Sequence, residues 1–130
     1  MKTINKNMTN GEIYTLAVGL MNSLKEDEIR FPAAVAYSIQ KNKAAIGALA
    51  EEIEKSRVGV IQHYASEQEG DSFVIAPENI DDANRELGDL LNLVQEVKIY
   101  TFKIEDISEV QLTSAQMNAI MFMIEEDEAE

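Results

Sequence analysis

The sequence predicts a mainly α single domain over residues 1–130, with a long antiparallel helical hairpin, flanking N- and C-terminal helices and a small β element. Apolar residues recur at three- and four-residue steps in four separate stretches, as in amphipathic helices. A further stretch, residues 97–104 (VKIYTFKI), is rich in β-branched and aromatic residues and predicts a strand. The chain has 130 residues, of which 45% are hydrophobic, so one domain can bury its own core.

The first predicted helix runs from about Gly11 to Lys25. Thr9 precedes Glu12 by three residues, which is the spacing of a capping box, in which each side chain binds a backbone N–H at the helix start. One apolar face follows, made of Ile13, Leu16, Ala17, Leu20 and Leu24. The charged residues after Leu24 predict the end of this helix and a link to the next.

A much longer helix is predicted from Pro32 to Ser66, because proline is well tolerated in a first turn and none recurs before Pro77. Its apolar residues alternate between steps of four and three: Val35, Ile39, Ile46, Leu49, Ile53 and Val60. Polar residues take three positions of the same stripe: Asn42, Ser56 and His63. This spacing is coiled-coil-like and favours burial against another helix. Gly59 lowers helix propensity locally, which allows a bend or break near it.

The second helix of the hairpin is predicted from about Ile80 to Val94, with Asn79 as its cap. The loop before it, residues 67–79, contains a candidate strand at Ser72–Ile75. Because the loop has roughly a dozen residues, the two helices are expected to lie antiparallel. A lone strand is not stable, so the strand at 97–104 needs a partner, and Met1–Asn5 and Ser72–Ile75 are both candidates.

The last predicted helix begins after Thr113, with Gln116 as its capping-box partner, and runs to about Glu126. It is apolar on nearly all sides, which indicates burial in the core or against a partner. Methionine adapts to varied apolar surfaces and recurs in interfaces. We therefore predict that this helix binds a partner protein or a second copy of the chain. The predicted contact residues are Met117, Ile120, Met121, Phe122 and Ile124.

Composition excludes several classes of function. Twenty-four acidic residues against eleven basic ones give a formal charge of −13, which disfavours direct binding to nucleic acid or anionic lipid. The absence of cysteine excludes thiolate metal sites and cysteine nucleophiles. No apolar run reaches the length of a membrane span, and no phosphate-binding loop or serine-nucleophile motif occurs. Because His63 is the only histidine, we predict a structural or surface role for it, with no metal and no cofactor.

Four carboxylates leave one enzymatic alternative open. Glu51 and Glu54 (E-x-x-E), with Glu86 and Asp89 (E-x-x-D), resemble the all-α nucleotide pyrophosphohydrolases of the MazG and dUTPase type. That resemblance implies a Mg²⁺-dependent nucleoside triphosphate pyrophosphohydrolase. However, each pair is expected on the outer face of its helix, away from the apolar stripe. We therefore favour a protein that is not an enzyme.

The order of several segments resembles an uncharacterised family of small proteins encoded by phages and prophages of Gram-positive bacteria. The segments are TNGEIYTLAVGL, AVAYSIQKNKAAI, EEIEKSR, HYASE, NRELGDLLNLVQEVKIYTFKIEDI and LTSAQMNAIMFMIEE, and the similarity covers residues 8–126. The resemblance implies a helical phage protein but carries no set of functional residues.

These observations predict a phage-encoded protein-binding or assembly accessory protein, similar in role to a tail-assembly chaperone or a virion-associated protein, that acts through apolar helical surfaces. Its partner would be a phage structural protein or a host protein, and it would itself form a homo-oligomer. The expected location is the bacterial host cytoplasm or the virion. A second alternative is an inhibitor of a host defence protein, and the acidic surplus makes mimicry of nucleic acid one way in which it could act.

Overall fold

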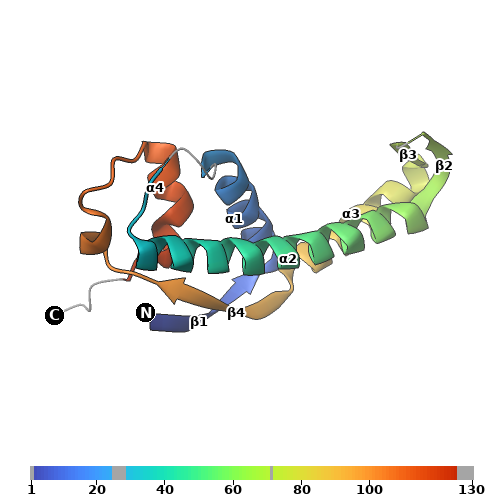
Figure 1. The fold of residues 1–130 in the computed structure, drawn as a ribbon. Helices are drawn as coiled ribbons and strands as arrows, with labels where there is room; N and C mark the ends of the chain where they lie inside the picture. The colour runs from blue at the N-terminus through green and yellow to red at the C-terminus, as the bar shows by residue number, and fades with distance from the viewer. Residues whose placement is uncertain (1, 25–28, 71, 126–130) are drawn as a thin grey trace.

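A computed structural model describes residues 2–24, 29–70 and 72–125 (Figure 1). The elements, in chain order, are β1 (Lys2–Thr9), α1 (Asn10–Ser23), α2 (Ala33–Tyr64), β2 (Ala65–Glu69), β3 (Ser72–Ile75), α3 (Pro77–Asn92), β4 (Val94–Thr101), the 3₁₀ helix η1 (Ile104–Ile107), α4 (Ser114–Ile120) and the 3₁₀ helix η2 (Met121–Met123). The predicted class, mainly α with a small β element, is confirmed. Figure 1 shows a body of α1, α4, β1, β4 and the N-terminal half of α2, from which the rest of α2 and α3 extend to a tip at β2 and β3.

The body is built on an antiparallel sheet of β1 and β4, in which Ile4 lies opposite Ile99. Side chains alternate between the two faces of a strand, and one face of this sheet is covered by helices. Val97, Ile99 and Thr101 of β4 are buried on that face, and Met8 of β1 is buried with them. Of the two candidate partners for the predicted strand, the N-terminal segment is therefore correct. The strand itself lies three residues earlier than predicted.

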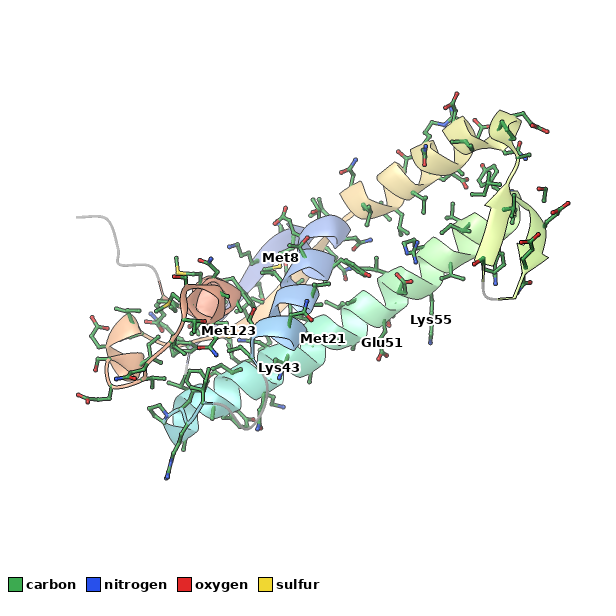
Figure 2. The ribbon with its side chains drawn as sticks, turned by 90° about the horizontal axis from the view of Figure 1, so that it is seen from above. Met8, Met21, Lys43, Glu51, Lys55 and Met123 are labelled. Atoms are coloured by element: carbon green, nitrogen blue, oxygen red, sulfur yellow. The ribbon has the colours of Figure 1, made fainter. Side chains whose placement is uncertain are left out.

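Helix α2 packs on β4, and α1 contacts both α2 and α4, so the three helices together close the core of the body (Figure 1). One half of the predicted capping box of α1 is present, since the Glu12 backbone N–H donates to the Thr9 hydroxyl over 3.1 Å. The Glu12 carboxylate accepts from the Thr9 hydroxyl over 3.3 Å, and not from its backbone N–H as predicted. Figure 2 labels two methionines of the core, Met8 and Met123, which come from opposite ends of the chain and are both almost completely buried. The sheet thus brings the first and last described segments together.

Helix α2 is continuous from Ala33 to Tyr64, so it does not break at Gly59 (Figure 2). Stabilisation of the flanking turns outweighs the cost of one glycine, which is about 1 kcal/mol relative to alanine. The three polar positions of the stripe also differ from one another. Asn42 is buried, whereas Ser56 and His63 are exposed. The stripe is therefore buried along the body and open to solvent toward the tip.

Helix α3 begins at Pro77 with Ala76 as its cap, so the prediction that Asn79 caps it is wrong. Proline takes the first helical position without loss, because that position has no intrahelical acceptor for an N–H. The predicted loop is partly a β-hairpin, in which the candidate strand Ser72–Ile75 pairs with the residues that follow α2 directly. Gly70 adopts a positive φ of 59° in the turn, which glycine accepts without steric cost.

The C-terminal helix is shorter than predicted. Helix α4 ends at Ile120, and the chain continues as the tighter turn η2 instead of reaching Glu126, which lies outside the described residues. The cause is a backbone contact with the sheet. Phe102 donates to the Met123 carbonyl over 3.1 Å, and Glu125 donates to the Phe102 carbonyl over 2.8 Å. A straight helix could not offer these groups to the end of β4.

Candidate functional site

The predicted contact residues divide into exposed and buried positions. Met121 is 57% exposed, whereas Ile120 beside it is completely buried in the core. Met117, Phe122 and Ile124 are half-buried and pack against the core cluster. Ile120 therefore offers no surface to a partner in this conformation, and the other four remain as candidates. Consecutive residues of a helical turn point about 100° apart, so Ile120 can face the core while Met121 faces solvent.

A groove of about 1010 Å³ lies between the N-terminal half of β1 and the C-terminal segment. Its apolar lining is Ile4, Ile104, Met121, Phe122 and Ile124. Three of these side chains are large and exposed, because Ile4 and Ile104 are each more than 40% accessible, as Met121 is. We call this feature the C-terminal groove. It brings three of the predicted contact residues together on one surface.

A second, shallower groove of about 550 Å³ continues from the first along β1. It shares Lys6 and Phe122 with the C-terminal groove and ends between Leu16 of α1 and Leu91 of α3. The two grooves together follow β1 on its helix-facing side. β1 therefore contributes residues to both grooves.

The backbone of β1 along the grooves has a free edge. On β4, the N–H and carbonyl of Tyr100 point away from β1, because both bind the side-chain amide of Asn42 over 2.8 Å. In an antiparallel pair of strands, the backbone groups of two directly opposite residues either both point toward the other strand or both point away from it. Thr3 lies opposite Tyr100, so the backbone groups of Thr3, and those of Asn5 and Asn7 by alternation, point outward. Among the described residues, no strand other than β4 pairs with β1.

The charge of the C-terminal groove differs from that of the whole chain. Three lysines line it (Lys2, Lys6 and Lys103), together with two glutamates (Glu105 and Glu125). The chain as a whole has eleven basic residues and a formal charge of −13. Lysines on an edge strand are also a known protection against unwanted pairing of like strands. The groove is therefore locally basic on a strongly acidic protein.

Sequence reasoning missed the β1 wall of this site, because it gives the N-terminal segment only the role of a pairing partner for the strand near Val97. The alternation of Lys2, Ile4 and Lys6 was a usable signal, since it places one apolar and two basic side chains on the same face of a strand. What the pattern could not tell is that the helical layer stops short of Ile4.

The four carboxylates of the enzymatic alternative do not form a cluster. Figure 2 shows Glu51 on the side of α2 that faces away from α1 and α3. Glu54 is paired with Arg57 through contacts of 2.6 and 2.8 Å. Glu86 and Asp89 are exposed on α3. Within the described ranges, no three acidic or histidine side chains come together as a metal ion requires.

Two of these carboxylates belong to pairs in which a pKa is shifted. The hydrogen bond from Arg57 lowers the pKa of Glu54 below its usual value. Partial removal from water raises the pKa of Tyr64, and its hydrogen bond with Glu86 raises it further. Both effects come from pairs on the surface of the arm formed by α2 and α3. Such pairs are typical of solvated helices.

His63 is exposed near the end of α2, where its ring meets the edge of Tyr64 with centroids 4.9 Å apart. Its position agrees with the predicted surface role.

Comparisons of the chain with protein-family models, with curated proteins and with solved structures found no match. In the described part of the chain, no helix has both the length and the apolar character needed to cross a membrane.

Proposed function

We propose that the protein is a non-enzymatic binding protein that holds a segment of another protein in the C-terminal groove. The observation that carries this proposal is the coincidence of exposed apolar side chains with a free strand edge. Met121, Ile4 and Ile104 surround the groove, and the outward backbone groups of β1 run beside it. Large exposed apolar patches on soluble domains are characteristic of protein-binding surfaces.

Two energetic contributions support binding at this place. Burial of apolar surface contributes roughly 25 cal/mol per Å², before the entropy of association is deducted. The backbone groups of Thr3 and Asn5 add hydrogen bonds that depend little on the partner's sequence. Long pairing surfaces of this kind suit a protein that accompanies another chain during assembly.

The proposal gives separate roles to the two parts of the molecule. The body carries the groove, and the long antiparallel hairpin of α2 and α3 extends from it as an arm that holds acidic side chains in solvent. The resemblance to phage and prophage proteins suggests a phage structural protein or a host protein as the partner, in the bacterial cytoplasm or the virion. Self-association through Met121 and its apolar neighbours in the groove is part of the proposal.

Site-specific photo-crosslinking tests this function. A photoreactive phenylalanine analogue at Met121 should crosslink a defined partner in the producing cell, whereas the same analogue at Glu52, exposed on α2, should not. The partner is then purified and titrated against the wild-type protein and against Met121→Asp by calorimetry. We expect the variant to lose binding by at least about tenfold, since a carboxylate must be desolvated in an apolar contact.

Met21→Asp is the matched control, because Met21 is 74% exposed on α1, away from the groove. Sedimentation of both variants tests self-association, and Met121→Asp should shift any oligomer to the monomer. Loss of binding or assembly in Met21→Asp alone would place the interface on α1 and overturn the proposal.

A further inference from the structure

The side chains of β1 that face the C-terminal groove follow a regular order. Lys2, Ile4 and Lys6 alternate with Thr3 and Asn5 along the strand, and all five line the groove. Lys2, Ile4 and Lys6 share the helix-facing side with their opposite residues on β4, which are buried there. The groove-facing side of the free edge therefore has the order basic, apolar, basic.

We propose that this edge binds an extended segment of the partner in which an apolar residue lies between two acidic residues, in the pattern acid–x–apolar–x–acid. This inference rests on the proposed function and names the chemistry of its partner. The segment adds to β1 as an antiparallel third strand. Its two acidic side chains lie opposite Lys2 and Lys6, and its apolar side chain lies opposite Ile4, over Met121 and Phe122.

The pattern follows from cross-strand pairing. Directly opposite side chains in an antiparallel pair interact, and opposite charges stabilise the pair while like charges destabilise it. Lys2, Ile4 and Lys6 would occupy non-hydrogen-bonded positions toward the new strand, because their backbone groups already point to β4. Side chains approach most closely at such positions. The charge and polarity of the partner's side chains opposite Lys2, Ile4 and Lys6 therefore affect binding more than those at the other positions.

A second copy of β1 fits the same edge poorly. If two β1 strands paired so that Ile4 met Ile4 of the second copy, Lys2 would lie directly opposite Lys6 of that copy, and Lys6 opposite its Lys2. Like charges in direct opposition are destabilising. Edge lysines commonly prevent self-pairing for this reason. The basic residues of β1 thus disfavour pairing with the β1 strand of a second copy and favour an acidic segment. Self-association through Met121 does not require that strand pairing.

The local charge supports the same choice. Lys103 adds a third cation to the groove, against the two glutamates Glu105 and Glu125, whereas the whole chain carries a net charge of −13. A basic partner would be attracted to the remainder of the surface and not to this groove. The net negative charge of the chain repels an acidic partner, so the three lysines favour binding of that partner at this groove.

A defined peptide tests the proposal. The probe is a capped, fluorescein-labelled peptide with the core Glu-Thr-Val-Thr-Glu and flanking threonines, and binding is measured by fluorescence polarisation. The comparison peptides have the cores Lys-Thr-Val-Thr-Lys and Glu-Thr-Ser-Thr-Glu. We expect each comparison peptide to bind roughly tenfold more weakly than the probe, from charge repulsion or from loss of the apolar contact.

Charge exchange distinguishes direct pairing from general attraction. In the double variant Lys2→Glu/Lys6→Glu, the relative affinities of the Glu-Thr-Val-Thr-Glu and Lys-Thr-Val-Thr-Lys peptides should reverse. The lysine peptide should then bind more tightly. Both lysines are exposed, and the fold does not depend on their charge. The control Lys41→Glu/Lys55→Glu makes the same change in net charge on exposed positions of α2 and should leave the order unchanged.

Backbone methylation tests the strand geometry. Methylation of the two threonine nitrogens in the core removes the donors that would face Thr3 and Asn5, and should abolish binding. Methylation of the valine and glutamate nitrogens, which would point away from β1, should leave binding within about threefold, as expected when no direct hydrogen bond is removed. Equal loss in both peptides, or no reversal in the double variant, would overturn the proposed strand addition.

The proposed function has a separate test. If the peptide does not bind, but binding of the partner crosslinked at Met121 is still lost in Met121→Asp, the groove binds protein in another geometry, such as a helix. If neither peptide nor partner depends on the groove, both the function and this inference are wrong.

Discussion

The side-chain amide of Asn42 binds both backbone groups of Tyr100, since its nitrogen donates to the Tyr100 carbonyl and its oxygen accepts from the Tyr100 N–H, each over 2.8 Å. Asn42 therefore stands in for a neighbouring strand at the inner edge of β4. The contact holds α2 against the sheet and satisfies the one edge that is buried. It also fixes which residues of β1 face outward, and so defines the free edge of the groove.

We expect Asn42→Ala to destabilise the protein by about 2–4 kcal/mol, because it leaves a buried donor and a buried acceptor on Tyr100 without partners. Ser56→Ala is the matched control on the same stripe of α2, where the side chain is exposed, and should change stability by less than about 0.5 kcal/mol. Urea unfolding of the two variants measures both values. Similar losses in the two would mean that the Asn42 contact contributes little.

Ile120 and Met121 are adjacent in sequence but opposite in burial, and their variants should separate stability from binding. Ile120→Ala creates a cavity in the core and should cost about 2–5 kcal/mol. Met121→Ala removes an exposed side chain and should cost less than about 0.5 kcal/mol. Thermal unfolding gives the comparison. A large loss for Met121→Ala would show that this residue belongs to the core and would remove it from the proposed site.

The N-terminus of α4 supports the wall of the groove through a complete capping box. The Gln116 N–H donates to the Thr113 hydroxyl over 3.1 Å, and the Thr113 N–H donates to the Gln116 side chain over 2.9 Å. Thr113→Ala should therefore cost about 1 kcal/mol of stability. Thr113→Ser keeps the hydroxyl and should retain most of it. Hydrogen exchange of the α4 amides, followed by mass spectrometry, localises the effect.

Local patterns predicted the elements of this fold well, because periodicity and caps depend on residues close in sequence. The capping residues Thr9 and Thr113 are confirmed for that reason. Pro77 and Asn79 are both residues typical of a helix start. Helix α3 begins at Pro77, because the fixed backbone geometry of proline favours the first helical position more than a side-chain cap at Asn79 does. The length of the C-terminal helix depended instead on the end of β4, a contact that no local pattern records.

The candidate site was predictable only in part, because it depends on where the helical layer ends. The sequence marks Ile4 and Ile99 alike as apolar strand residues, yet Ile99 is fully buried and Ile4 is 44% exposed. In the sequence, Asn42 is only a polar interruption of an apolar helical stripe. Its role became visible only with Tyr100 beside it, 58 residues further along the chain. Long-range placement of this kind carries no periodic signal.

The ion pair of Glu54 and Arg57 should make a small contribution that depends on pH. The hydrogen bond from Arg57 lowers the pKa of Glu54 in the folded state, so the pair stabilises the protein above the unfolded pKa near 4.5 and loses its effect as the pH falls through the folded value. Both side chains are about 40% exposed, so solvent screening limits the gain to about 0.5 kcal/mol. Unfolding of Glu54→Gln at pH 7 and pH 3 measures it, and the difference from wild type should be smaller at the lower pH.

The same substitution should have opposite effects at two glycines of the arm. Gly59 lies inside α2, where an added Cβ would meet no atom of another part of the chain within 4 Å, so Gly59→Ala should stabilise the protein by about 0.5–1 kcal/mol. Gly70 has a φ of 59° in the β2–β3 turn, where an L side chain is strained, so Gly70→Ala should cost about 1–2 kcal/mol. Thermal unfolding of the two variants gives the signs. Gly70→Asn is the control for the turn, because asparagine tolerates this backbone conformation better than alanine, and it should recover part of the loss. A stabilising effect at both positions would mean that the turn does not hold Gly70 in the left-handed region.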